Sequence, residues 1–200
     1  MNAVYHTSLL LILGTVLTVS APSQNGTSPV ATSSVTPTSQ AKFDPPIRLP
    51  NNLVDFFSGE WDGTGEFASG KKIEADISFT PDLDRQWLVY RHTDRPPNRY
   101  KALGMWGFEY ASRRFIMVIN DNFGGARRFS SEGWLNGKVF FEKIAELTPP
   151  TNVGLPAAPT RHERFTFERQ DGDTLRMTYE SSDDGKNWRL GDYLIFKRKR

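Results

Sequence analysis

The sequence has no cysteine among its 200 residues. This absence excludes disulfides, thiolate metal sites, iron–sulfur clusters and a cysteine nucleophile. It also excludes the lipidated cysteine that anchors bacterial lipoproteins. Histidine is scarce as well, since only His92 and His162 lie beyond the N-terminal segment. Because a zinc site needs three or four close ligands, a metal centre would depend on carboxylates, and we predict none.

Charge of one sign is not in excess either. Lys and Arg number 25 against 23 Asp and Glu, which gives a formal net charge of +2. The basic residues 197–200 end the chain without a longer basic stripe, as is typical of a solvated tail. We therefore expect no nucleic-acid partner.

Recognisable catalytic motifs are also missing. Acidic residues lie on or near the expected strands, but nothing in the sequence sets two of them at a working distance. Ser130 and Ser131 lack a nucleophile-elbow context, and no phosphate loop or dinucleotide fingerprint is present. We predict no catalytic residues. Enzymatic activity stays open, and the residues favour a protein that is not an enzyme.

Long apolar runs are absent, with one short exception at residues 8–19. This run has the length of a signal peptide and is short for a membrane span, and small residues at 19–21 offer a cleavage site. We predict a signal peptide over residues 1–21 and a secreted or periplasmic protein, with no stable membrane span after cleavage. An uncleaved anchor is the alternative, and it places the domain outside the cytoplasm too.

The remainder divides into a tether and one domain. Residues 22–42 are rich in Ser, Thr and Pro and cannot bury enough apolar surface to order themselves, so we predict a disordered tether. Residues 43–200 have the size of one ordinary domain. In it, residues 50–57 predict one short helical turn capped by Asn51 or Asn52. No helical period is sustained after Asp62.

Runs of β-branched and aromatic residues alternate with turn signals over the rest of the domain. They predict about ten strands, at residues 60–68, 73–79, 86–93, 100–110, 114–120, 127–134, 138–145, 161–169, 174–181 and 188–197. Short links favour sequential antiparallel pairing, and so many twisted strands avoid open edges by closing. Glycines inside strands, such as Gly63 and Gly65, predict sharp bends or close approach. The fold class is therefore all-β, a single antiparallel up-and-down barrel.

A resemblance supports this fold. Gly59-Glu60-Trp61-Asp62-Gly63-Thr64-Gly65 resembles the opening of lipocalin-like (calycin) barrels, in which the tryptophan packs across the barrel base. Segments 107–110, 114–118, 121–125, 131–134 and 184–188 resemble an uncharacterised calycin-like family of exported bacterial proteins, a domain of unknown function. The similarity covers about residues 53–197. It implies a fold and no activity.

The same opening also resembles nitrobindin-type haem-binding barrels, which carry an axial histidine on a late strand. His162, in Arg161-His162-Glu163-Arg164, is the only candidate for that histidine here. This resemblance implies a haem-binding protein or a haem-assisted enzyme as an alternative. No other cofactor is predicted. His92 is expected at a strand end.

Aromatic residues are plentiful, with 14 Phe, 5 Trp and 6 Tyr, and they occur on almost every expected strand. They either fill the core or line a cavity for a small hydrophobic or amphipathic molecule. Binding of such a molecule is our leading hypothesis, and a structural or interaction domain with a filled core is a further alternative. The candidate cavity residues are Trp61, Phe79, Trp87, Trp106, Phe115, Met117, Trp134, Phe167 and Tyr179. Residues 122–125 and 147–160 are the expected rim loops.

Overall fold

The computed structural model describes residues 47–144 and 161–200. The predicted signal peptide, the tether and the rim loop at 147–160 lie outside the described residues. Everything described belongs to one compact unit, residues 44–200. In this part of the chain, no helix has both the length and the apolar character needed to cross a membrane.

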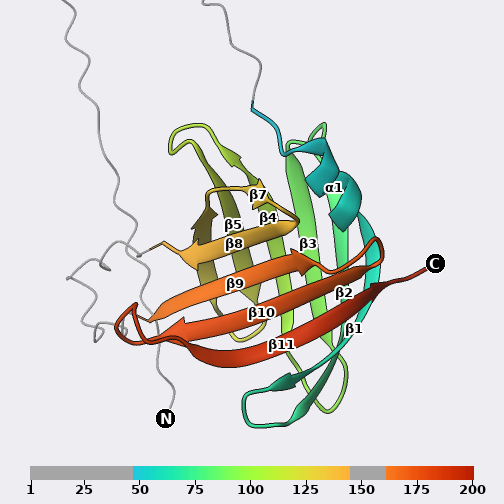
Figure 1. Ribbon diagram of the computed structural model, residues 1–200, viewed down its shortest axis with the longest axis vertical. Coiled ribbons are helices and arrows are strands. Elements are labelled where there is room, and N and C mark those ends of the chain that lie inside the picture. Colours follow the sequence, from blue (N-terminus) through green and yellow to red (C-terminus); the bar gives the residue numbers. More distant parts are fainter. Residues whose placement is uncertain (1–46, 145–160) are drawn as a thin grey trace, which may run out of the picture. The chain divides into compact units, whose positions relative to one another are not determined.

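The described residues form one short helix and one continuous sheet (Figure 1). Adjacent strands pair antiparallel, and β1 also pairs with β11. β6 pairs with β8, which closes the sheet into a ten-strand barrel, and β7 is an additional strand. The predicted all-β barrel is confirmed. The strands are β1 (Gly59–Phe67), β2 (Lys72–Asp82), β3 (Trp87–Asp94), β4 (Lys101–Glu109), β5 (Arg114–Asp121), β6 (Ala126–Ser131), β7 (Trp134–Leu135), β8 (Lys138–Lys143), β9 (His162–Arg169), β10 (Thr174–Ser182) and β11 (Arg189–Arg198).

One predicted strand is interrupted. The expected strand at 127–134 is divided into β6 and β7, because Gly133 has a φ of +124° that breaks the extended run. The predicted hairpin at Asn136-Gly137 is present, with φ values of +52° and +78°. β8 therefore pairs with β7 across the hairpin and with β6 beyond the break.

The short helix α1 (Asn51–Phe57) buries Leu53, Val54, Phe56 and Phe57 against the barrel. The predicted side-chain cap is wrong. Pro50 precedes the helix, and Asn51 and Asn52 lie exposed inside its first turn, where neither side chain caps it. The helix is therefore held by its apolar face rather than by a cap.

Trp61 and Arg198 fasten α1 across one end of the barrel. The Trp61 indole is fully buried, and its Nε1 donates to the carbonyl oxygen of Phe57 at 2.9 Å. The Arg198 guanidinium lies 4.1 Å from the Trp61 ring centroid and donates to the carbonyl oxygens of Phe56 and Ser58 at 2.6 and 2.7 Å. Trp61 thus lies where the lipocalin-like resemblance expects it.

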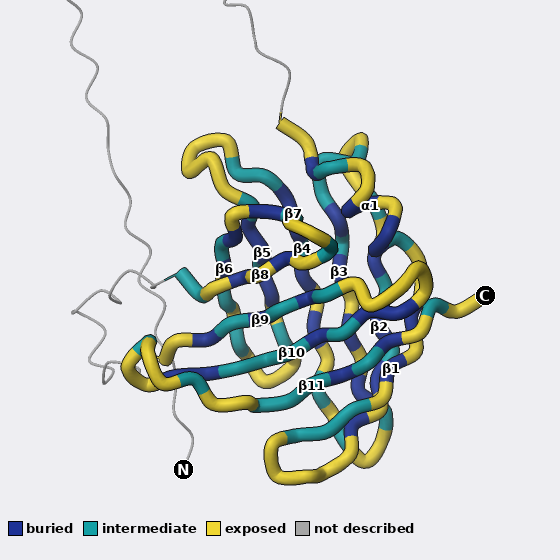
Figure 2. Tube along the Cα trace, viewed as in Figure 1, coloured by how far each residue is buried: buried dark blue, intermediate teal, exposed yellow. Residues whose placement is uncertain are grey.

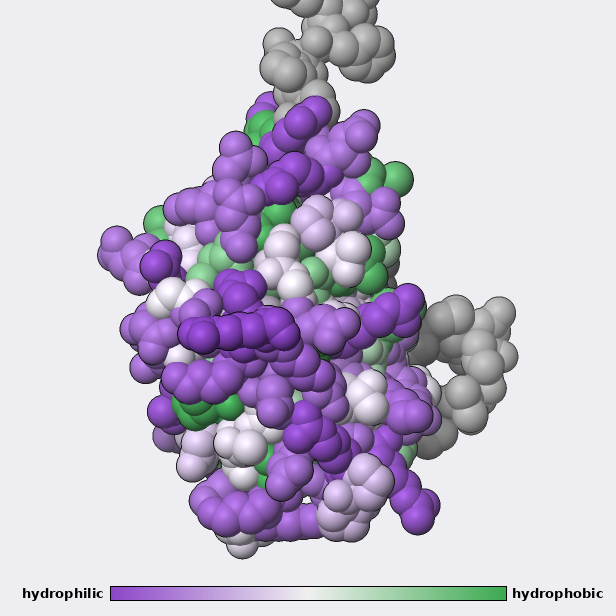
Figure 3. Space-filling model, turned by 90° about the vertical axis from the view of Figure 1, so that its right-hand side faces the viewer, coloured by the Kyte–Doolittle hydropathy of each residue, from purple (hydrophilic) through white to green (hydrophobic). Residues whose placement is uncertain are grey.

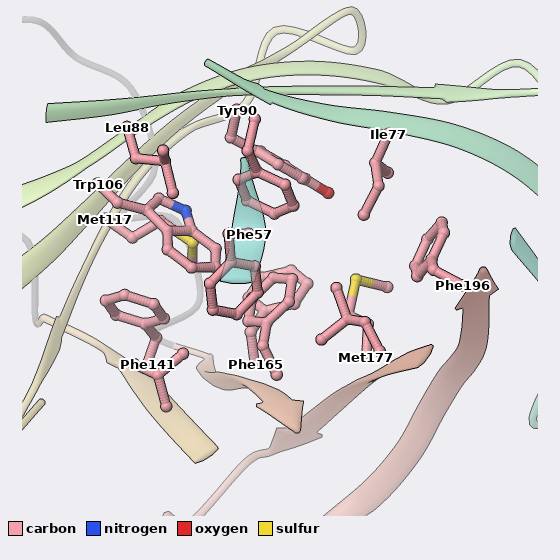
Figure 4. Close-up of a cluster of buried hydrophobic side chains, with 14 of the residues drawn as sticks. Phe57, Ile77, Leu88, Tyr90, Trp106, Met117, Phe141, Phe165, Met177 and Phe196 are labelled. Atoms are coloured by element: carbon pink, nitrogen blue, oxygen red, sulfur yellow. The ribbon is translucent and has the colours of Figure 1, made fainter. Parts of the chain in front are cut away.

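Aromatic rings fill the interior next to α1. In Figure 4, Phe57 reaches from the helix into the space between Tyr90, Trp106 and Phe165. The Phe57 ring centroid lies 5.0 Å from those of Phe79 and Trp106, a spacing typical of edge and tilted aromatic pairs. Figure 2 shows buried positions alternating with intermediate or exposed ones along the strands, and the face in Figure 3 is mostly hydrophilic. The closed end of the barrel is a packed core.

Two predicted strand glycines permit close approach between β1 and β11. A β-carbon at Gly63 would lie 2.3 Å from the Phe196 ring, and one at Gly65 would lie 1.8 Å from the carbonyl oxygen of Tyr193. β1 and β11 therefore pack too closely at these two positions to accommodate any side chain larger than that of glycine.

Gly65→Ala is expected to lower the free energy of unfolding by roughly 2–3 kcal/mol or more, because the new methyl group meets backbone that cannot rotate away. Gly172→Ala is the matched control, since nothing lies within 4 Å of its β-carbon position. Urea unfolding of both variants measures the difference. Equal stability of the two would show that β1 and β11 can separate at no cost.

Candidate functional site

A cavity of about 410 Å³ is lined in part by residues of the β1–β2, β3–β4 and β5–β6 loops. These loops lie at the end of the barrel away from α1 (Figure 1). Alternation along the strands brings side chains of one parity to this common interior. The lining residues are Phe67, Lys71, Ile73, Tyr90, His92, Asp94, Pro97, Asn98, Arg99, Tyr100, Ile119, Phe123, Arg127, Phe165, Phe167, Met177, Tyr179, Asp192 and Leu194.

The inner wall of the cavity is apolar. Ile73, Ile119, Phe167, Met177 and Leu194 are all at most 3% exposed, and they come from five different strands. They separate the cavity from the packed core described above. An apolar molecule that reached this depth would meet mainly aliphatic and aromatic carbon.

A chain of three polar side chains runs along β3 towards the mouth. Tyr90, His92 and Asp94 share one face of the strand, and all three are buried. The Tyr90 hydroxyl lies 2.8 Å from Nδ1 of His92, and Nε2 of His92 lies 2.7 Å from Oδ1 of Asp94. This arrangement assigns the imidazole proton to Nε2, with the phenol donating to Nδ1. Burial raises the pKa of Tyr90 well above its ordinary value, so the phenol keeps its proton.

Asp192, on β11, adds a second carboxyl group to the same wall. Its Oδ1 is buried and has no hydrogen-bond partner within the described part of the chain. Burial, together with repulsion from the Asp94 charge, raises the pKa of Asp192 to about 7. Near neutral pH this carboxyl group is thus close to half protonated.

Arg127, on β6, forms a second polar group across the cavity. Its guanidinium donates to Glu163 at 2.8 Å, to Asp121 at 3.0 Å and to the Tyr100 hydroxyl at 3.1 Å. Only Nε is buried without a partner among the described residues. Arg127 is therefore already neutralised by two carboxylates.

Glu163, on β9, links this group to two further side chains. It accepts hydrogen bonds from Lys143 at 3.1 Å and from the Tyr179 hydroxyl at 3.0 Å. Burial alone would raise the pKa of Glu163, but hydrogen bonds and charge from Arg127 and Lys143 lower it below its ordinary value. Burial and the nearby Glu163 charge raise the pKa of Tyr179. At neutral pH the network holds two cations and two carboxylates.

The structure brings two of the nine predicted cavity residues to the cavity wall, Phe167 and Tyr179. The other seven lie elsewhere: Trp61, Phe79, Trp106 and Met117 are buried in the packed core, Phe115 and Trp134 are half-buried against it, and Trp87 is half-buried over Gly107. Of the expected rim loops, residues 122–125 contribute Phe123 to the lining. Residues 147–160 lie outside the described residues.

His92, Asp94 and Asp192 were not predicted as site residues, although β3 carries a signal for two of them. Leu88 and Tyr90 mark the inward parity of β3, and the same parity continues to His92 and Asp94. His92 therefore points into the barrel, and is more than a residue at a strand end. Asp192 likewise follows the parity of Leu194 and Phe196, which are buried.

The described residues do not fit a haem site. His162 is exposed at the start of β9 and does not line the cavity. His92 does line it, but Tyr90 and Asp94 engage both of its ring nitrogens. An axial ligand needs one free nitrogen. In the described ranges, no group of three or more His, Asp or Glu could hold a metal ion.

Comparisons with known proteins support the fold and no further identity. No family model and no curated protein sequence matches the chain. The crystal structure of Rv2717c from M. tuberculosis is similar, with a TM-score of 0.50 and 14% identity over 76% of this chain and 99% of that one. Two designed barrels, a de novo fluorescence-activating barrel and the redesigned barrel mFAP1 bound to DFHBI, each match at 11% identity, covering 74% of this chain and 97% of theirs. Their TM-scores of 0.39 and 0.31 are too low to carry an argument.

Fold and site together define a class, a closed antiparallel barrel with a cavity at one end. The likeness to Rv2717c is a likeness of fold alone.

Asp192→Asn is expected to change how stability depends on pH. Because the folded pKa of about 7 lies above the ordinary value of 3.8, the folded protein retains this proton and loses stability as pH rises from about 4 to 7. The loss is on the order of 3–4 kcal/mol, and asparagine removes it. Urea unfolding from about pH 4 to 8 measures the slope.

Asp84→Asn is the matched control for this experiment, since Asp84 is exposed. It should leave the pH slope of the wild type unchanged. If Asp192→Asn also keeps that slope, the Asp192 carboxyl group does not titrate near neutrality.

Proposed function

We propose that this chain is an exported binding protein that holds a small amphipathic molecule in its barrel. The single observation that carries this proposal is the cavity of about 410 Å³ at one end of an otherwise filled interior. Binding sites for small molecules are typically clefts of about 300–1,000 Å³ with apolar walls and a few polar groups. Export rests on the signal-peptide pattern of residues 1–21.

The packing of the barrel supports a cavity that is retained for use. Protein interiors are normally packed as densely as organic crystals, and the end near α1 follows that rule with fully buried Trp61, Trp106 and Phe141. The opposite end has inward residues of ordinary size but leaves room between them. A fold needs no such space for its own stability, so the space is best explained by an occupant.

Two unsatisfied polar atoms support the same conclusion. Oδ1 of Asp192 is a buried acceptor and Nε of Arg127 is a buried donor, and both residues line the cavity. Buried polar atoms are nearly always hydrogen-bonded, so each exception needs an explanation. A ligand with its own donor and acceptor would satisfy both atoms, while its apolar part contacts Ile119 and Met177.

The neutral fluorophore N-phenyl-1-naphthylamine is expected to bind the full-length chain with saturable, enhanced emission. Met177→Trp should weaken this binding by about tenfold or more, because the larger side chain occupies the cavity. Thr178→Trp is the control, since its neighbouring position on β10 faces outward and lies outside the cavity lining. Circular dichroism confirms folding of both variants.

A wild-type chain that gives no saturable emission would contradict the binding proposal. So would a folded Met177→Trp variant that binds the fluorophore as well as Thr178→Trp does, because the probe would then lie elsewhere on the protein.

A further inference from the structure

We propose that the cavity selects an organic cation, a small amphipathic molecule whose protonated amine or quaternary ammonium group lies beside Asp94 and Asp192. This inference rests on the proposed function, because it names the chemical class of the molecule that the cavity binds. Four observations support it: the balance of charge, the unpartnered carboxyl group, the aromatic rings at the mouth and the saturation of Arg127.

The buried charges around the cavity do not cancel once its exposed cations are set aside. Arg127 and Lys143 are matched by Asp121 and Glu163, as the ion pairs of 2.8–3.1 Å show. Lys71 and Arg99 also reach the lining, but both are exposed, so solvent and salt screen their charges. The carboxyl groups of Asp94 and Asp192 are left without a buried Lys or Arg among the described residues.

We call the part of the cavity that is lined by Asp94 and Asp192 its acidic pole. The Asp94 side chain is 5% exposed, and Nε2 of His92 lies 2.7 Å from its Oδ1. Oδ1 of Asp192 has no hydrogen-bond partner in the described part of the chain. Both residues line the same cavity, and the Asp94 charge adds to the effect of burial in raising the pKa of Asp192. One cation placed between them would offset both charges, and a desolvated pair of this kind is strong when its hydrogen bonds are complete.

Aromatic rings surround the approach to this pole. The Tyr100 ring lies 5.3 Å from the His92 ring and 6.3 Å from the Phe123 ring, centroid to centroid. Phe67 lies across the mouth, and the ammonium group of Lys71 is already 5.9 Å from its ring centroid. Faces of Phe and Tyr attract cations. The mouth is thus built from groups that favour positive charge.

An anionic ligand would find little to bind. The terminal nitrogens of Arg127 already donate to Glu163, Asp121 and Tyr100, which leaves only Nε. A carboxylate entering the cavity would also face the charge of Asp94, and the cations left to offset it, Lys71 and Arg99, are exposed and screened by solvent. Among the described residues, the cavity therefore has no buried guanidinium that is free to bind a carboxylate of the ligand.

Three indole compounds test the choice of charge, because they share a ring and a two-carbon chain and differ at the end group. They are tryptamine (cationic), indole-3-ethanol (neutral) and indole-3-acetate (anionic). Isothermal titration of the full-length chain near pH 8, where Asp192 is mostly ionised and the amine is still protonated, measures each affinity. Tryptamine is expected to bind about tenfold more tightly than the alcohol, and the acetate most weakly.

Two substitutions test the assigned carboxyl groups. Asp192→Asn and Asp94→Asn should each weaken tryptamine binding by about tenfold and leave indole-3-ethanol within about twofold of the wild type. Asp84→Asn, at an exposed position remote from the cavity lining, should change neither affinity. Two variants are used because Asp94 is hydrogen-bonded to His92 and its replacement can disturb folding, whereas Oδ1 of Asp192 has no hydrogen-bond partner among the described residues.

The outcomes separate this inference from the proposed function. Equal affinity for all three compounds, or binding of the neutral fluorophore without any preference for tryptamine, would overturn the cation and leave the binding function in place. Tryptamine binding that survives Asp192→Asn and Asp94→Asn unchanged would overturn the assigned pole. Failure of the fluorophore and of all three indoles would overturn the binding function itself.

Discussion

The structure depends on one geometric constraint, that every second residue of ten paired strands must share a single enclosed space. Because the pairings β1–β11 and β6–β8 close the sheet, these inward side chains must lie inside the barrel. The residue type at each inward position then determines whether the interior of the barrel is filled or open at that depth. Near α1 the inward residues are large and aromatic, and they fill the space. Towards the opposite loops they become tyrosine, histidine, aspartate and arginine, and the space remains partly open.

The position of the polar groups follows from the same constraint. Charged side chains are seldom buried unless they are paired, and at the mouth they reach both each other and solvent. The network around Arg127 satisfies this condition from its own members, whereas the pair formed by Asp94 and Asp192 does not. That asymmetry distinguishes a structural ion network from the carboxyl groups that we propose meet a ligand. It also explains how two polar groups in one cavity can differ in role.

Much of the fold could be predicted from the sequence, because alternation and turn residues are local signals. The interruption at Gly133 was missed, since an isolated glycine does not reveal that its φ is positive. The cavity residues were harder to predict. Parity indicates that Trp106 and Phe167 both point inward, but it does not indicate depth, and only Phe167 reaches the cavity. Whether an interior is filled depends on how neighbouring rings interlock across the barrel, which a linear pattern does not record. His92 and Asp94 could have been found by extending the parity of Leu88.

The hydrogen bonds from Arg198 to the carbonyl groups at the end of α1 have a consequence for the order of folding. Arg198 bonds to carbonyl groups 140 and 142 residues earlier in the chain. The helix is made first during synthesis, yet its hydrogen bonds to Arg198 cannot form until the final strand has left the ribosome. Contacts of such long sequence separation form late, because the chain entropy of closing the loop must be overcome first. Until then Trp61 and the apolar face of α1 hold the helix at the end of the barrel.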